Sequence, residues 1–176
     1  DCDVVRLPIN LHAMTNGEPD YVVDTMFFYY LDQVVDWSVE LELNLILDNH
    51  TIDDAKDKAV EVPLMKIWPQ IAQHYKEKPD NIYYEILNEP NTLNPADWAR
   101  IQQNVLDTIR TIDVVHTVLV TGADWGGIYG LTRLVPLADT NLIYSFHFYD
   151  PMLFTHQGAT WTSPSMGDLA NVPFPY

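Results

Sequence analysis

The stretch of this chain best suited to chemistry is the tripeptide Asn88-Glu89-Pro90, which ends an apolar run at residues 82–87. A run of this composition is typical of a strand that is covered on both faces. A carboxyl group at the tip of such a strand is held rigidly, and the proline that follows stops the strand and fixes the loop. Asn88 adds a neutral amide that binds a hydroxyl without repelling a carboxylate. Glu89 is therefore a candidate for acid–base chemistry.

The rest of the chain alternates between strand-like and helical patterns. Apolar or β-branched runs occupy residues 4–9, 43–47, 82–87, 117–121 and 142–146. Apolar residues at helical spacing predict helices around residues 27–38, 64–75 and 94–112, and a shorter one near 127–137.

Prolines and an asparagine indicate where some of these elements begin or end. Asn94 and Pro95 are suited to the start of the third helix, whereas Pro63 and Pro69 predict a late start or a kink in the second. The proline-containing tail from residue 150 onward is interpreted as a long loop.

Alternation of strands and helices predicts an α/β fold with parallel strands and right-handed crossovers. About five βα units could form an open doubly wound sheet or part of a (β/α)8 TIM barrel. No glycine-rich phosphate loop follows any of the strands, which disfavours a nucleotide-binding open sheet. Polar residues stand at one strand end after another, as in barrel enzymes. The prediction is therefore a partial (β/α)8 barrel.

Composition excludes several classes of protein. The 176 residues are 47% hydrophobic, enough for one domain with a core, and 9 Lys and Arg face 25 Asp and Glu for a net charge of −16. Such a surface repels phosphate backbones and anionic lipids, so neither nucleic acid nor membrane is an expected partner. Cys2 is the single cysteine, which excludes an intrachain disulfide and a thiolate metal cluster. A neutral ligand suits this chain best.

Several candidate site residues stand in or near the ends of the predicted strands. His147 and Tyr149 alternate with Phe146 and Phe148, so the histidine and tyrosine share one side of their strand. The full set is Arg6, His50, Asn88, Glu89, Trp125, His147 and Tyr149.

The order of four short motifs resembles glycoside hydrolase family 5, the cellulase-like (β/α)8 barrels, over nearly the whole chain. The motifs are Val5-Arg6-Leu7-Pro8, Asp48-Asn49-His50, Asn88-Glu89-Pro90 and His147-Phe148-Tyr149. The resemblance implies a retaining glycosidase that needs neither a metal ion nor an organic cofactor. It also implies that Glu89 is the general acid/base and that Asn88 binds the 2-hydroxyl of the sugar being cleaved.

The resemblance assigns roles to the other candidates as well. His50 lines the substrate site, His147 lies near the acid/base, and Tyr149 approaches the nucleophile. Arg6 keeps that nucleophile ionised, although a structural ion pair with Glu85 is an alternative.

Aromatic and loop residues were weighed separately. Trp125 is a candidate sugar platform, with core packing as the competing interpretation. Asp48 is expected to hold loops or to pair with a neighbour, and His156 and Trp161 are candidates for the rim of the cleft.

The nucleophile of the family is a glutamate at the tip of the seventh strand, and no glutamate follows Glu89 here. The five predicted strands correspond to the second to sixth of the family. We therefore expect residues 1–176 to be an incomplete catalytic domain that lacks strands 1, 7 and 8 and is inactive alone. Asp124 and Asp150 do not occupy the matching position. By resemblance, the full-length protein would be secreted or periplasmic.

The leading hypothesis is an endo-β-1,4-glucanase whose partner is a β-glucan or related polysaccharide. A β-mannanase or another β-glucanase of the same family is a close alternative. A non-catalytic carbohydrate-binding domain belongs to a different class. A metal-dependent barrel hydrolase would use Asp48, His50 and His147, but no His-x-His ligand pair supports it.

Overall fold

The computed structural model describes residues 2–52, 60–91 and 93–174. Its sheet has five parallel strands whose spatial order equals their order in the sequence. The strands are β1 (Val4–Ile9), β2 (Asn44–Asn49), β3 (Ile82–Glu85), β4 (Thr117–Thr121) and β5 (Leu142–Ser145). A doubly wound sheet reverses its strand order at a switch point, whereas this singly wound order is that of a (β/α)8 barrel. The predicted partial TIM barrel is confirmed.

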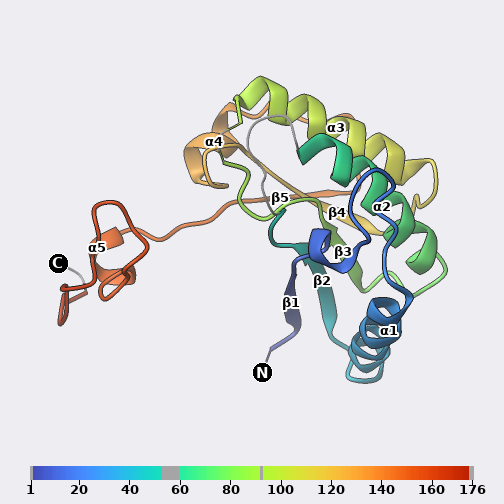
Figure 1. Ribbon diagram of the computed structural model, residues 1–176, viewed down its shortest axis with the longest axis horizontal. Helices are drawn as coiled ribbons and strands as arrows, with labels where there is room; N and C mark the ends of the chain where they lie inside the picture. Colours follow the sequence, from blue (N-terminus) through green and yellow to red (C-terminus); the bar gives the residue numbers. More distant parts are fainter. Residues whose placement is uncertain (1, 53–59, 92, 175–176) are drawn as a thin grey trace. The chain divides into compact units, whose positions relative to one another are not determined.

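Helices follow the strands as the alternation predicts. The described elements are η1 (His12–Met14), α1 (Thr25–Glu40), α2 (Glu61–Tyr75), α3 (Pro95–Arg110), α4 (Ile128–Arg133) and α5 (Met152–Thr155). α1, α2 and α3 cover one face of the sheet, with α2 and α3 side by side (Figure 1). None of the helices in the described ranges is both long and apolar enough to cross a bilayer.

Helix α3 begins as its sequence predicts. The side chain of Asn94 accepts a hydrogen bond from the backbone N–H of Ala96 at 2.8 Å, and Pro95 occupies the first helical position. Of the late start or kink predicted for α2, the late start is wrong, because the helix begins at Glu61, ahead of Pro63, and Pro69 lies inside it. A proline in the first turn costs no hydrogen bond, since that N–H has no partner inside the helix.

Some predicted boundaries are corrected. β2 continues to Asn49, beyond the predicted end at residue 47, because the backbone still pairs with Pro8 and Ile9 of β1. β3 ends at Glu85, two residues before the predicted end at residue 87. α4 ends at Arg133, whereas the predicted helix extended to about residue 137. The predicted tail loop contains the single-turn helix α5.

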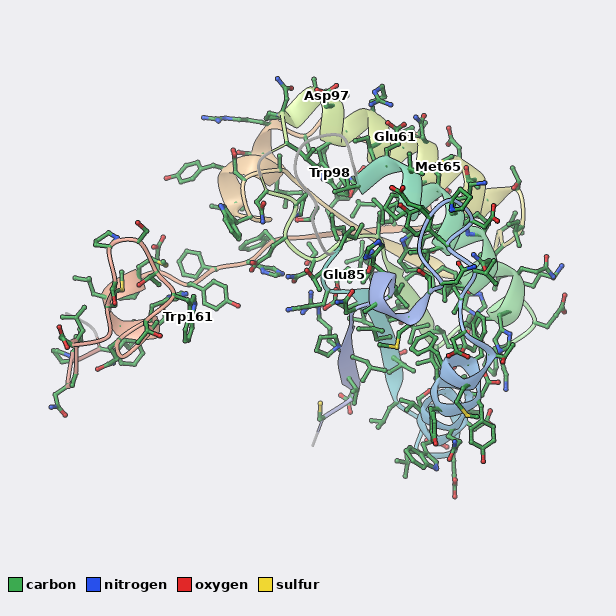
Figure 2. All side chains as sticks on the ribbon, viewed as in Figure 1. Glu61, Met65, Glu85, Asp97, Trp98 and Trp161 are labelled. Carbon is green, nitrogen blue, oxygen red and sulfur yellow. The ribbon has the colours of Figure 1, made fainter. Side chains whose placement is uncertain are left out.

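Two buried tryptophans fix the carboxyl ends of the central strands. Trp68 of α2 donates its indole N–H to the carbonyl of Ile86 at 3.1 Å. Trp98, labelled in Figure 2, extends from α3 toward the sheet and donates to the carbonyl of Thr121 at 2.8 Å. Both side chains are fully buried. Helices α2 and α3 therefore bind directly to the carboxyl ends of β3 and β4, where the loops after these strands begin.

The chain divides into two compact units, Asp1–Phe146 and His147–Tyr176. The first contains the whole sheet and α1 to α4. In the second, Tyr149 packs edge-on against His156, and Phe154 packs against Phe174. The candidates His147, Tyr149, His156 and Trp161 belong to this second unit, and the roles predicted for them stay predictions.

Candidate active site

Arg6 is the hub of the polar groups at the carboxyl ends of the strands. Its Nε donates to Oε2 of Glu85 at 2.6 Å, and its Nη2 donates to Oε1 of the same carboxylate at 2.8 Å. Nη2 also lies 2.7 Å from Oδ1 of Asn88 and 3.0 Å from Oδ2 of Asp48. One guanidinium thus joins β1, β2 and the segment from β3 to Asn88. The structural ion pair weighed for Arg6 is present.

The two acids beside Arg6 are register partners. Asp48 of β2 is paired with Glu85 of β3 in the parallel ladder, and both are buried. Two carboxylates in one dry environment repel each other unless a cation lies between them. Arg6 supplies that cation in a two-pronged geometry that suits a carboxylate.

The pKa of Asp48 is raised to about 6, and burial is the largest cause. The charge of Glu85 also raises it, while the hydrogen bond to His50 and the charges of Arg6 and His50 act in the opposite direction. Asp48 therefore changes its charge in mildly acidic solution.

The side-chain amide of Asn88 is held with its oxygen toward Arg6 and its NH2 group available to a ligand. Its backbone N–H donates to the carbonyl of Asn49 at 3.0 Å, and its Oδ1 accepts from Arg6. Because Arg6 fixes the oxygen, the amide NH2 is the group that Asn88 can offer as a donor. This orientation follows from the register of three strands.

A pocket of about 300 Å³ opens at these strand ends. This volume is at the lower end of the range for small-molecule sites. The pocket is lined by His50, Thr51, Ile52, Val60, Leu87, Asn88, Glu89, Pro90, Asn91, Leu93 and Trp125. Four of the predicted site residues, His50, Asn88, Glu89 and Trp125, therefore share one concave surface, and Arg6 supports it through Asn88.

The loop after β4 places Trp125 in the pocket wall. Asp124, Trp125 and Gly126 have φ angles of 62°, 60° and 65°, a left-handed stretch that only glycine adopts without cost. The backbone N–H of Trp125 donates to the carbonyl of Pro90 at 3.2 Å, which ties this loop to the one after Glu89. Trp125 is 61% exposed, so it is not a core-packing residue.

A close approach of two backbone segments supports the same loop. A Cβ on Gly130 of α4 would lie 1.9 Å from the carbonyl oxygen of Ala123. Only glycine permits this distance. The start of α4 thereby presses directly against the loop that carries Trp125.

The sequence did not predict that Asp48 contacts both Arg6 and His50 at the candidate site. Asp48 pairs with a neighbour as expected, since Nδ1 of His50 lies 2.7 Å from its Oδ2. The signal was its spacing: two residues apart on an extended segment, Asp48 and His50 lie on the same side. Among the described residues, no three His, Cys, Asp or Glu side chains are grouped as a metal site requires.

Consecutive parallel βα units with polar, acidic side chains at their carboxyl ends are typical of TIM-barrel enzymes. The chain matches the family described as Cellulase (glycosyl hydrolase family 5) over residues 1–171. It therefore belongs to glycosyl hydrolase family 5, which confirms the predicted family.

Similar proteins agree with this assignment. Endoglucanase 3 of Fibrobacter succinogenes is 32% identical over 98% of this chain, and Endoglucanase C of Acetivibrio thermocellus is 27% identical over 98%. Cel5A of Thermotoga maritima, solved in complex with mannotriose, superimposes over 98% of the chain with a TM-score of 0.89 and 33% identity.

The chain spans only part of these relatives. It covers 29% of Endoglucanase 3, 54% of Endoglucanase C and 58% of the Thermotoga chain. About two fifths of the solved relative therefore has no counterpart among these residues.

Proposed function

We propose that these residues form the acid/base half of the active site of a retaining endo-β-1,4-glucanase. The observation that carries the proposal is the shared pocket of Glu89, Asn88 and Trp125, in which Arg6 fixes the amide of Asn88. The endoglucanase names of the relatives support the same activity. The substrate is a β-glucan, and the full-length protein acts where such polymers occur, secreted or in the periplasm.

The mechanism assigns two proton transfers to Glu89. Its carboxylic acid gives a proton to the glycosidic oxygen while a second carboxylate attacks the anomeric carbon, so the leaving sugar departs as a neutral alcohol. Glu89, now ionised, then takes a proton from the water that breaks the glycosyl–enzyme bond. The second carboxylate would come from the part of the barrel that has no counterpart here.

Asn88 and Trp125 bind the sugar in this proposal. The amide NH2 of Asn88 donates to the 2-hydroxyl, a contact that strengthens as positive charge develops on the ring. Trp125 presents an exposed indole face to the C–H face of a pyranose. By resemblance to the family, His147 and Tyr149 are proposed as further substrate-binding residues.

A β-mannan is a second candidate substrate. Thermotoga maritima Cel5A was solved both with mannotriose and with cellobiose. A relative that accommodates both sugars makes mannan hydrolysis worth measuring beside glucan hydrolysis.

The test is Glu89→Gln in the full-length protein that carries these residues. The amide keeps the shape and loses the transferable proton, so kcat on unactivated cello-oligosaccharides should fall by about 10²- to 10⁴-fold. Substrates with leaving groups that need no protonation should lose least in the glycosylation step. Glu77→Gln, a surface substitution after α2, is the matched control.

Near-native turnover of Glu89→Gln on unactivated oligosaccharides would refute the assignment. A wild-type protein that binds these oligosaccharides without cleaving them would instead favour the non-catalytic carbohydrate-binding alternative.

A further inference from the structure

The pair Asp48–His50 connects the Arg6 hub to the pocket. Asp48 is fully buried, and its Oδ2 lies 2.7 Å from Nδ1 of His50 and 3.0 Å from Nη2 of Arg6. The His50 side chain is 46% exposed and lines the pocket beside Glu89. One carboxylate oxygen therefore contacts both the group that orients Asn88 and a ring that faces the ligand.

This contact determines which nitrogen of His50 carries a proton. An ionised carboxylate is only an acceptor, so Nδ1 must donate to it. In a neutral imidazole the other nitrogen, Nε2, then holds a lone pair. The ring of His50 consequently meets a ligand in the pocket as a hydrogen-bond acceptor.

We propose that Asp48 is a positioning residue that holds His50 in the Nδ1–H form, so that Nε2 accepts a hydrogen bond from a sugar hydroxyl. The identity of the ligand as a sugar rests on the proposed function. The tautomer of His50 does not, because the contact with Asp48 sets it.

The pair also responds to pH. The described charged groups that face Asp48 are Arg6 of β1, Glu85 of β3 and His50 itself, and together with burial they bring the pKa of Asp48 to about 6. A proton gained by Asp48 removes its charge and weakens it as the acceptor that holds His50 in the Nδ1–H form. KM should therefore rise as the pH falls through the pKa of Asp48.

The first measurement needs no substitution. In full-length protein with ¹⁵N-labelled histidine at pH 8, the His50 signals, assigned with His50→Gln, should show a protonated Nδ1 and an unprotonated Nε2. Free imidazole in water prefers the opposite tautomer, so an Nε2–H ring in the wild type overturns the proposal.

The second measurement uses variants. Asp48→Ala removes the acceptor and should convert His50 to the Nε2–H form and raise KM for a soluble β-glucan by about two- to tenfold, the value of one hydrogen bond, with a smaller change in kcat. Asp48→Asn should keep the wild-type tautomer and KM within about twofold, because Arg6 keeps an oxygen turned toward itself and His50.

Asp32→Asn is the matched control, since Asp32 holds His74 at 2.8 Å on the outer surface. It should leave the His50 signals and KM unchanged. An Asp48→Ala protein with the wild-type tautomer and KM contradicts the proposal. If Asp48→Ala does not fold, Asp48→Asn takes its place in the test. A change of the His50 tautomer in Asp48→Asn without a change in KM would also contradict the proposal. If the ring is Nδ1–H but the wild type hydrolyses no glycan, the proposed function fails, and the positioning claim stands on the tautomer.

Discussion

Two aspartate–histidine pairs lie at opposite ends of the same sheet. Asp48 and His50 are 2.7 Å apart at the carboxyl end of β2, and Asp113 and His116 are 2.6 Å apart just before the amino end of β4. Their contact distances are nearly equal. Both aspartates are buried, but the hydrogen bonds of the two pairs and the exposure of the two histidines differ.

The pair before β4 has a partner for each of its groups. His116 and Asp113 are both fully buried, and Nε2 of His116 lies 3.0 Å from the carbonyl of Pro79. Each ring nitrogen of His116 therefore lies within hydrogen-bond distance of an oxygen atom. Asp113 also accepts from the hydroxyl of Tyr84 and from the backbone N–H groups of Val115 and His116.

The pair at the end of β2 is less completely satisfied. Oδ1 of Asp48 is buried without a hydrogen-bond partner among the described residues, and His50 opens onto the pocket. Burial and the charge of Glu85 raise the pKa of Asp48, whereas hydrogen bonds overcome the effect of burial on Asp113 and lower its pKa. The pair at the amino end of the sheet is therefore fully hydrogen-bonded, whereas the pair at the carboxyl end has a buried oxygen without a partner in the described part of the chain and a raised pKa, features that are common at functional sites.

The largest effect on stability should come from His116→Ala. Removing His116 leaves the buried carboxylate of Asp113 without one of its hydrogen-bond partners, and uncompensated buried charge of this kind costs about 3–5 kcal/mol of unfolding free energy. Urea unfolding of the full-length protein measures this loss. His50→Ala is the matched substitution at the other end, and it should cost far less stability while raising KM. Equal losses for both histidines would remove the distinction between the two ends.

A smaller loss is expected from Gly130→Ala. The new Cβ would lie 1.9 Å from the Ala123 carbonyl, so α4 or the Trp125 loop must shift. Overpacking of this kind costs about 1–3 kcal/mol, and here the shift should also raise KM because the loop lines the pocket. Gly158→Ala, where a Cβ would meet open space but φ is 82°, separates backbone strain from the clash. Unchanged KM in Gly130→Ala would show that the loop does not depend on this contact.

The smallest stability effect should come from Trp125→Ala. An exposed side chain contributes little to folding, so the unfolding free energy should change by less than about 0.5 kcal/mol. Affinity for cello-oligosaccharides, measured by calorimetry, should nevertheless fall, because the stacking surface is lost. A large loss of stability with unchanged affinity would show that Trp125 stabilises the fold and does not bind the sugar.

Much of the fold could be predicted because barrel strands and helices have simple patterns. The bounds of β1 and β4 agree with the apolar runs at residues 4–9 and 117–121, and Asn94-Pro95 marked the start of α3. β2 was predicted too short because Asp48 and Asn49 are buried and polar, and hydropathy does not register backbone pairing.

The site could be predicted only in part. The strand-end positions of His50, Asn88, Glu89 and Trp125 were sufficient to place them together. The contacts of Arg6 with Glu85, Asn88 and Asp48 depend on the register of three strands, which no local pattern contains. The exposure of Trp125 likewise follows from the left-handed loop after β4.

The most direct test of the contrast between the two ends is one substitution made twice, Asp48→Asn and Asp113→Asn, followed by unfolding free energies at pH 5 and pH 8. The raised pKa of Asp48 means that its folded form binds a proton more tightly than its unfolded form. Its contribution to stability is therefore present below the unfolded pKa, near 4, and is lost as pH rises through about 6.

Relative to wild type, Asp48→Asn should thus gain roughly 1 kcal/mol between pH 5 and pH 8. Asp113, whose pKa is lowered, contributes stability that is lost only in more acidic solution. Asp113→Asn should therefore cost about 3 kcal/mol or more at both pH values, with no such gain. A gain with pH in Asp113→Asn, or its absence in Asp48→Asn, would contradict the contrast between a fully hydrogen-bonded pair at one end of the sheet and a titratable pair at the other.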